Sequence, residues 1–386
     1  MSIATVHISS RIPSGYLDVH LEVGVEILAL VGHPGAGKSV VLRSIAGVQT
    51  PDSGSITIND ETVFSSALEI LLATPDRQIG FVPQGGALYP HLSVLENVAL
   101  PLLKRRGRLP TYLATAEQVA HERAFWTLQV VRAERVARQR PPELDLEMRI
   151  RVALARALVV DPVLLIMDDP LSTLQDAPRH AMRAELAAVL AATKVPTLMG
   201  TPQLDEAYEL ADRIALLEDG RILQVAAPHT LLTRPASRRV AEFVRAVNII
   251  PGDVSTAIDG TVEVTTSMGR FTATESDTAR FPLVGRVDLV VRPEHVRVLD
   301  ASESDGFNVV HGVITDELRH GDMIAVAVRP NGIDLPPLQL LIPALRYREL
   351  QLTIGSSLRL EIPPEAVHIM ARPLDGILPA GEQPYS

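Results

Sequence analysis

Residues 32–39, with the sequence GHPGAGKS, have the residue types and spacing of a phosphate-binding loop. The glycines let the backbone curl so that several N–H groups point at one centre. Lys38 supplies a positive charge to the phosphates, and the Ser39 hydroxyl is a ligand for Mg²⁺. Residues 26–31 predict a buried strand before the loop, and residues 38–46 predict a helix after it, whose N-terminus favours anions. The sequence therefore predicts binding of a nucleoside triphosphate together with Mg²⁺.

The expected nucleotide contacts come from this loop and from one aromatic residue before it. Tyr16 lies in a predicted strand and could stack on the adenine ring, although a half-buried strand aromatic is an equally open interpretation. The expected nucleotide-binding residues are Gly32, His33, Pro34, Gly35, Ala36, Gly37, Lys38, Ser39, Val40 and Tyr16.

Two adjacent aspartates follow a second apolar strand at residues 163–167. They stand at the carboxyl end of that strand, the edge at which open α/β sheets bind ligands. Phosphoryl transfer needs a phosphate cradle, Mg²⁺ ligands and a placed water. Ser39 and Asp168 are the expected metal ligands, Asp169 is the expected base, and Gln84 is expected at both the metal and the water. Alone, the aspartates could form a solvated turn, but the loop upstream favours the functional interpretation.

Composition limits the classes of protein that the chain can represent. Its 386 residues suffice for two or three domains, and a net charge of −10 argues against a nucleic-acid partner. The lack of cysteine excludes disulfides and thiolate metal sites and fits a reducing cytoplasm. The first residues lack the pattern of a secretory signal. The longest apolar stretch is interrupted by Arg156, Asp161 and Pro162, so a membrane role has to go through a partner.

Local patterns predict the elements that hold these residues. Residues 1–30 alternate as antiparallel strands, and Ser93 with Glu96 forms a capping box at a helix start. A hairpin is expected to turn at Asp219-Gly220. Further strands are expected at residues 55–58, 78–84 and 196–199, and helices at 117–140, 148–159, 185–192 and 204–210.

The sequence after residue 247 changes to β-branched alternation and is internally duplicated. Residues 248–252 resemble residues 308–312, and residues 287–298 resemble residues 358–369. Two similar small β units packed together are the simplest interpretation. Within the second unit, residues 344–348 carry two arginines that could meet an anion, but a solvated strand edge is the favoured interpretation.

The motifs resemble those of the nucleotide-binding subunits of ABC transporters over about residues 5–245. The matching segments are VGHPGAGKSV, GFVPQGGALYPHLSVLENV, RVALARALVVDPVLLIMDDPLSTL and ELADRIALLEDGRILQ. NIIPG and VVRPEHVRV are similar to the TOBE domains of ABC importer ATPases. The resemblance implies an α/β P-loop NTPase domain at 1–245 with a helical subdomain at about 90–160. It further implies an all-β, OB-like domain at 246–372. The duplication indicates two similar units within this domain, and the Pro- and Gly-rich residues 373–386 are expected to form a tail.

The implied function is the ATP-binding subunit of an ABC importer that couples ATP binding and hydrolysis to solute uptake. SGYLDVHLEV and DETVFSSALEILLATPDRQIGFVPQ look most like molybdate, tungstate or sulfate importers, and a sugar or a polyamine is the alternative solute. The implied partners are transmembrane permease subunits, a second ATPase subunit and, indirectly, a periplasmic or extracellular solute-binding protein, at the cytoplasmic side of the membrane. The permease is expected to dock beside Gln84, along residues 84–92, although their apolar side chains could instead bury against the helical subdomain.

The chain departs from the family pattern at four places. The signature segment, usually LSGGQ, aligns with LDLEM at residues 144–148, where Asp145 can cap the helix but adds negative charge near a phosphate. Asp169 replaces a glutamate that is longer by one methylene, about 1.5 Å. Pro202 replaces the switch histidine, and Gln175 replaces an aspartate. We therefore expect retained ATP binding and slow hydrolysis, or alternatively a non-catalytic regulatory or structural subunit of a transporter.

Overall fold

The computed structural model describes residues 2–104, 116–258, 260–274, 285–300, 303, 306–332 and 336–372. The chain divides into two compact units, Met1–Pro228 and His229–Ser386. Within the described ranges, no helix is long and apolar enough to cross a membrane. The predicted tail at 373–386 lies outside the described residues.

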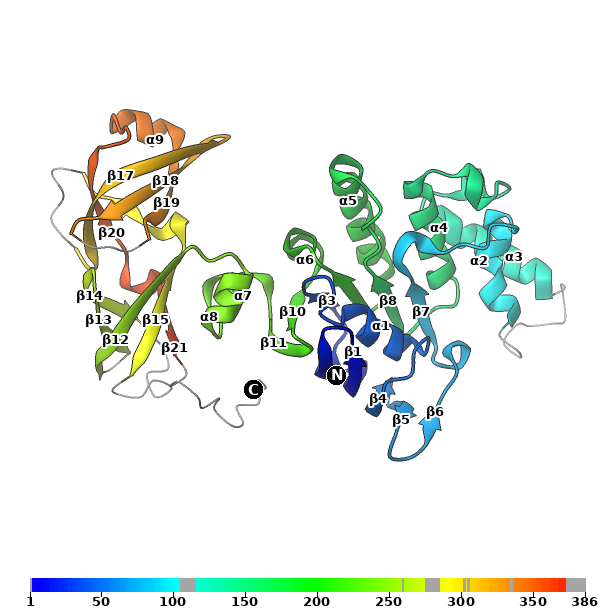
Figure 1. The fold of residues 1–386 in the computed structure, drawn as a ribbon. Coiled ribbons are helices and arrows are strands. Elements are labelled where there is room, and N and C mark those ends of the chain that lie inside the picture. Colours follow the sequence, from blue (N-terminus) through cyan, green and yellow to red (C-terminus); the bar gives the residue numbers. More distant parts are fainter. Residues whose placement is uncertain are drawn as a thin grey trace. The chain divides into compact units, whose positions relative to one another are not determined.

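The first unit contains an antiparallel sheet and a mostly parallel sheet (Figure 1). The antiparallel sheet has the order β2 (Gly15–Val23), β1 (Ala4–Ile12), β4 (Ser53–Ile58), β5 (Glu61–Ser65), β6 (Ile70–Leu71). The parallel sheet has the order β11 (Arg221–Ala226), β10 (Arg213–Glu218), β3 (Ile27–Val31), β9 (Thr197–Thr201), β8 (Leu164–Asp168), β7 (Ile79–Val82). Only β11 runs antiparallel to its neighbour, through the predicted hairpin with β10.

Helix α1 (Lys38–Ala46) shares one core with both sheets. Its Val41, Leu42 and Ile45 are fully buried. Strands β3, β8 and β9 are almost wholly buried, which is why their sequences are continuously apolar rather than alternating. The helix predicted at residues 38–46 is confirmed, and it begins directly at the glycine-rich loop.

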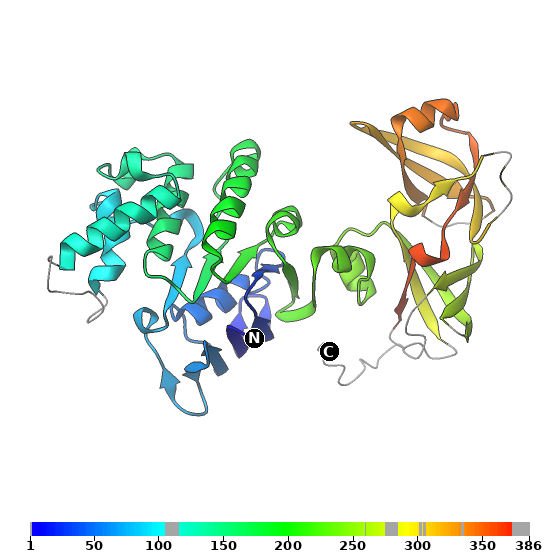
Figure 2. The same ribbon diagram turned by 180° about the vertical axis from the view of Figure 1, so that it is seen from behind.

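The other helices of the first unit are α2 (Val94–Lys104), α3 (Ala116–Val130), α4 (Leu146–Leu158), α5 (Asp176–Thr193) and α6 (Leu204–Leu210). Helices α2, α3 and α4 pack on one another as a helical layer at one end of the unit, at the predicted residues (Figure 2). The capping box is confirmed, because Ser93 N donates to Glu96 Oε2 at 2.7 Å and Glu96 N donates to Ser93 Oγ at 3.2 Å.

Two helix predictions in this unit were wrong in extent. The helix predicted to reach residue 140 ends at Val130, because Arg132 adopts a left-handed φ of 55° that stops the helical ladder. Helix α5 begins at Asp176 rather than at residue 185, since Pro178 lies in its first turn, where proline is tolerated.

The second unit begins with helices α7 (Pro228–Thr233) and α8 (Arg238–Phe243), followed by two antiparallel sheets. The first sheet has the order β14 (Gly269–Thr274), β13 (Thr261–Thr266), β12 (Asn248–Ile258), β15 (Arg286–Val291), β21 (Val367–Ala371). The second has the order β16 (Arg297–Val298), β20 (Ser357–Glu361), β17 (Val309–His320), β18 (Met323–Pro330), β19 (Leu338–Pro343), and helix α9 (Ala344–Glu349) follows.

The two sequence repeats exchange their last strands. Strand β16 ends the first repeat but pairs with β20 of the second, and β21 ends the second repeat but pairs with β15 of the first. Side chains from both sheets then fill a single core. The two similar β units therefore pack together as predicted, and the exchange of one strand each interlocks them in one domain.

One asparagine at the start of each repeat fastens the two sheets. Asn248 bonds the backbone of Gln339 on β19, with Nδ2 to O at 2.8 Å and Gln339 N to Oδ1 at 2.7 Å. Asn308 makes the equivalent pair with Thr272 on β14, at 2.8 and 2.6 Å, and its Nδ2 also donates to Ile362 O at 2.9 Å. Both side chains are buried, so these amides replace strand pairing between the halves.

Replacement of Asn308 by alanine is expected to destabilise the second unit by about 3 kcal/mol, because buried backbone groups of Thr272 and Ile362 would lose their partners. Urea unfolding of the full chain measures the loss. The exposed Asn331, changed to alanine, is the matched control and should change stability little. Equal losses of stability for the two substitutions would contradict the role of Asn308 in joining the two sheets.

Two further predictions differ from the structure. The domain boundary was placed after residue 245, but α8 belongs to the second unit, since Ala241 packs on Val290 and Met370. Residues 344–348 form helix α9 rather than a strand edge. Its Arg346 binds Asp300 through Nη2 at 2.7 Å, so this arginine already has an acidic partner.

Candidate functional site

The glycine-rich loop joins β3 to α1 and encloses the side chain of its own lysine. Gly32 has no room for a side chain, because a Cβ atom there would lie 2.3 Å from Leu217 O. Gly37 has a φ of 106°, which favours glycine. Lys38 Nζ donates to Gly32 O at 2.7 Å and to His33 O at 3.1 Å. The predicted loop residues thus form one continuous cradle at the N-terminus of α1.

The cradle carries charge that suits a polyphosphate. Lys38 is buried, which lowers the pKa of its ammonium group, while Asp169 and Asp168 oppose that shift. The first backbone N–H groups of α1, including those of Ser39 and Val40, have no helical acceptor because they open the helix. A phosphate group would accept these N–H groups and neutralise the partly desolvated ammonium.

Ser39 and Asp168 come together as predicted, from α1 and the end of β8. Ser39 Oγ donates to Asp168 Oδ1 at 2.7 Å. Asp168 is 2% exposed, and its Oδ2 lies 3.3 Å from Arg43 Nη2, with no hydrogen bond from any described residue. A hydroxyl and a buried carboxylate are hard oxygen donors, so this pair fits Mg²⁺, which would screen the phosphate charge. The sequence had not indicated Arg43 as a neighbour of this pair.

Asp169 stands in a strained turn directly after the metal pair. Its φ is 47°, and its backbone N–H donates to Gly200 O at 2.9 Å. Burial raises the pKa of Asp169 to about 6, with a further contribution from Glu206 and opposition from Lys38. A carboxyl with a pKa near neutrality is suited to general-base chemistry.

The raised pKa of Asp169 means that folding disfavours the ionised carboxylate. The free energy of unfolding should therefore depend on pH through this group. Above a pH of about 6 the ionised group destabilises the fold, and below the ordinary value of 3.8 the group is neutral in both states. Asp169→Asn should therefore stabilise the nucleotide- and Mg²⁺-free chain by about 1 kcal/mol at alkaline pH, after allowance for solvent screening. The gain should vanish at acidic pH. Urea unfolding across pH tests this, and a pH-independent gain would contradict it.

A buried ion pair between α5 and α6 is bonded to the loop that follows Asp169. Arg179 of α5 donates to Leu171 O and Ser172 O, both at 3.2 Å, and its Nε lies 3.6 Å from Glu206 Oε1. Glu206 of α6 accepts a 2.6 Å hydrogen bond from Thr201 Oγ1 at the end of β9. The sequence analysis missed Arg179 and Glu206, since they lie on different helices and only the fold brings them together.

Gln84 reaches this assembly through Ser172. Its Nε2 donates to Ser172 Oγ at 3.3 Å, and Ser172 Oγ donates to Asp169 O at 2.8 Å. The bond of Gln84 thus goes to the loop after Asp169, whereas Ser39 and Asp168 pair with each other. A direct role of Gln84 at the metal stays a prediction.

The residues that depart from the family pattern include three at the ends of α4, α5 and β9. Asp145 caps α4, as expected, because Met148 N donates to its Oδ1 at 2.7 Å. Leu146 is 45% exposed at the start of that helix. Pro202 follows β9 without an N–H or a titratable group, and Gln175 precedes α5 without a side-chain capping bond.

Tyr16 stands at the start of β2 and is 56% exposed. The β1–β2 hairpin lies beside the loop, because Ser14 Oγ donates to Gly35 O at 2.9 Å. The ring is therefore accessible on an element next to the cradle, and its stacking on adenine stays a prediction.

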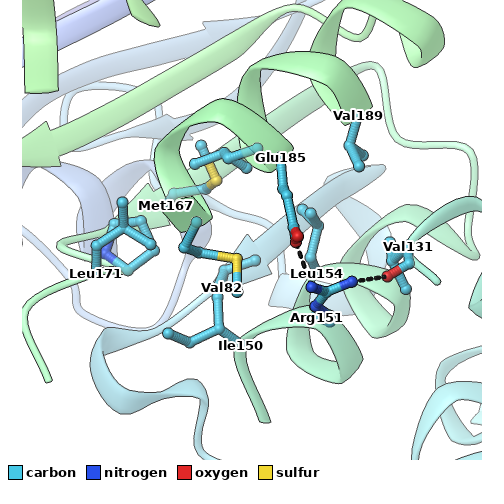
Figure 3. Close-up of a pocket in the computed structure, with 12 residues that line it drawn as sticks. Val82, Val131, Ile150, Arg151, Leu154, Met167, Leu171, Glu185 and Val189 are labelled. Carbon is cyan, nitrogen blue, oxygen red and sulfur yellow. Dashed lines mark hydrogen bonds and ion pairs between the residues drawn. The ribbon is translucent and has the colours of Figure 1, made fainter. Parts of the chain in front are cut away.

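A small apolar cavity is lined by residues of α4 and α5 and by Val82 and Met167 of β7 and β8 (Figure 3). Arg151 of α4 lines it and forms an ion pair with Glu185 of α5 and a 3.4 Å hydrogen bond from Nη1 to Val131 O. Met167, one residue before the metal aspartate, also lines it. The helix that begins at the signature segment is thus linked to the helix that follows the Asp169 loop.

The parallel sheet, the loop before α1 and the Ser39–Asp168 pair define a P-loop nucleotide-binding protein. A family model described as ABC transporter matches residues 17–172, and one described as TOBE domain matches residues 289–370. A sulfate/thiosulfate import ATP-binding protein of Xylella fastidiosa is 38% identical over 74% of this chain and 76% of its own length. A spermidine/putrescine import ATP-binding protein of Methylococcus capsulatus is 36% identical over 73% of this chain and 69% of its own length.

The solved structures add a likeness of fold. The structure of cbiO1 from Clostridium perfringens, described as part of the ABC transporter complex cbiONQ, covers 60% of this chain and 90% of its own, with a TM-score of 0.50 and 22% identity. The family itself is established by the sequence relatives above. The chain belongs to the ABC transporter ATP-binding family and carries a TOBE domain.

Proposed function

We propose that this chain is the ATP-binding subunit of an ABC importer in which nucleotide binding is retained and hydrolysis is slow. The observation that carries the proposal is an intact cradle and Ser39–Asp168 pair beside altered catalytic positions. Residues 32–40 hold the phosphates, Ser39 and Asp168 hold Mg²⁺, Asp169 orients the attacking water, and Gln84 connects the site to its surroundings.

The arrangement of sites in this family explains why a partner would not restore full activity. Each ATP lies between the cradle of one subunit and the signature helix of the other. In a homodimer both sites combine Asp169 and Pro202 with the acidic signature. With an intact second ATPase subunit, one site still uses Asp169 and Pro202, and the other still uses Asp145 and Glu147. Loss of a well-placed base costs about 10²–10⁴-fold in rate.

The partners of this subunit are transmembrane permeases, a second ATPase subunit and, indirectly, a solute-binding protein, which places it at the cytoplasmic face of the membrane. The names of the relatives favour sulfate or a polyamine as solute, and the N-terminal segments favour an oxyanion such as sulfate or molybdate. Uptake of labelled sulfate, molybdate and spermidine by cells with and without this chain tests the proposal. If cells without this chain take up all three solutes at the normal rate, the proposal is contradicted.

The second candidate is a nucleotide-binding regulatory or structural subunit that stabilises a transporter without turnover. The signature segment favours it, because Leu146 and Glu147 occupy positions where small uncharged residues would meet a phosphate. Solute uptake that depends on this chain but is unaffected by Asp169→Asn would support this candidate over the first.

A further inference from the structure

A buried arginine lies at the end of α1 that is opposite to the phosphate loop. Arg77 follows a short turn before β7 and is 2% exposed. Its Nη1 donates to Ser44 O at 2.7 Å and to Ile45 O at 2.9 Å, both in the last turn of α1. Its Nε donates to Leu72 O at 3.0 Å. One guanidinium therefore joins α1 to the segment that leads into β7.

The end of α1 is shaped around this guanidinium. The last carbonyl groups of a helix lack helical N–H partners and carry the negative end of its dipole, so a cation is favoured there. Gly47 directly follows α1, and a Cβ atom at this position would lie 2.6 Å from Arg77 Nε and 2.8 Å from Arg77 Cζ. A side chain at residue 47 would therefore displace the guanidinium from its two acceptors on α1.

The charge of Arg77 is costly to bury and has no carboxylate to offset it. Burial lowers the pKa of the guanidinium, and no acidic side chain of the described residues forms an ion pair with it. A methionine would fill much of the same space without that cost. Space filling therefore does not account for an arginine at this position. What the guanidinium adds is a set of directed hydrogen bonds between separate elements.

The segment after Arg77 is fixed to the strand that carries the metal aspartate. Gln78 O accepts a hydrogen bond from Val163 N at 2.9 Å, and β7 then pairs with β8. Strand β8 ends at Asp168, whereas Ser39 stands on α1. Because α1 rises about 13 Å over its nine residues, a tilt at its far end would move Ser39 relative to Asp168. The two expected metal ligands thus belong to elements that Arg77 connects.

We propose that Arg77 is a positioning residue for the metal site, which fixes α1 against β7 and β8 so that Ser39 and Asp168 face one another. The inference rests on the proposed binding of Mg-ATP and adds a residue that acts on it from a distance. Its effect should be larger on the metal pair than on the phosphate cradle. Lys38 and the loop before it continue directly into α1 and move with it, whereas Ser39 and Asp168 come from different elements.

The test compares the ATP affinity of the full chain in Mg²⁺ and in EDTA by isothermal titration calorimetry. The ratio of the two affinities is the Mg²⁺ enhancement, which should be about tenfold for the wild type, since the ion would join the phosphates to two protein oxygens. Arg77→Met and the shorter, neutral Arg77→Gln should lose most of the enhancement, with affinities in EDTA within about twofold of the wild type. Arg77→Lys should keep most of it, because an ammonium group can also donate to the carbonyls of α1. Arg221→Met, at an exposed arginine of the same unit, is the matched control and should behave as wild type.

A double-mutant cycle separates positioning from a general disturbance of the fold. If Arg77 acts through the metal pair, Ser39→Ala alone should remove the Mg²⁺ enhancement, and Arg77→Met added to it should remove no more. Additive losses would overturn the proposal, and so would an equal loss of affinity in Mg²⁺ and in EDTA. A wild-type enhancement in Arg77→Met or Arg77→Gln, with the fold verified by urea unfolding, would also overturn it and leave Mg-ATP binding intact. If the wild type itself shows no enhancement, the proposed metal pair fails together with the role of Arg77.

Discussion

Replacement of Lys38 by alanine is expected to weaken Mg-ATP binding by about 100-fold, or roughly 3 kcal/mol. The reason is geometric, since Lys38 Nζ is the cation held over the loop by Gly32 O and His33 O, where it can meet the phosphates. Removal of a buried cation should leave the fold intact, so the loss is confined to binding. Isothermal titration calorimetry with Mg-ATP measures it.

The matched control for Lys38→Ala is Lys194→Asn, at an exposed lysine that caps α5 in a left-handed conformation, which asparagine tolerates. This control should bind ATP as the wild type does. Wild-type affinity in Lys38→Ala would show that residues 32–39 are not the nucleotide site.

Restoration of the altered catalytic positions is expected to raise hydrolysis. Asp169→Glu combined with Pro202→His should increase turnover by about 10²-fold, the lower end of the contribution of a positioned base. The glutamate extends the carboxylate from the turn after β8, and the histidine adds a group that can contact the γ-phosphate. Phosphate release at saturating Mg-ATP measures the gain.

The same variant separates the two candidate functions. Asp169→Asn combined with Pro202→His is the control. It introduces the switch histidine but removes the carboxylate that would act as base, so its hydrolysis rate should rise little. If the repaired variant binds ATP normally but gains no activity, the acidic signature segment limits turnover or the subunit is non-catalytic. Such a result would contradict the assignment of the slow step to Asp169 and Pro202.

The sequence was most informative where local chemistry determines structure. The limits of α1 and α6, the turn at Asp219-Gly220 and the capping box of Ser93 were all predicted and are confirmed. In each case the feature that determines the element, a glycine, a capping side chain or an apolar period, lies within a few residues of it. Ser39 and Asp168 were predicted to ligate one Mg²⁺, and the structure brings their side chains within hydrogen-bonding distance, because a loop before a helix and the end of a parallel strand meet at one sheet edge. Their binding of the metal stays a prediction.

The features that sequence analysis missed depend on residues far apart in the chain. Arg179 and Glu206 lie on different helices, and only the fold shows that their ion pair surrounds the Asp169 turn. The strand exchange of β16 and β21 was hidden, since each strand resembles its own repeat and yet pairs with the other. Helix α9 was mistaken for a strand edge because its six residues make fewer than two helical turns, too few for a period to be recognised.

Single-turnover hydrolysis of Mg-ATP by the wild-type chain, measured alongside stoichiometric ATP binding, tests the central claim most directly. We predict one ATP bound per chain and a hydrolysis rate below about 0.01 s⁻¹, since ordinary enzymes turn over at about 1–10³ s⁻¹ and the altered base and switch remove about 10²-fold or more. A rate of about 1 s⁻¹ or faster would contradict the account, because Asp169, Pro202 and the acidic signature would then support normal catalysis.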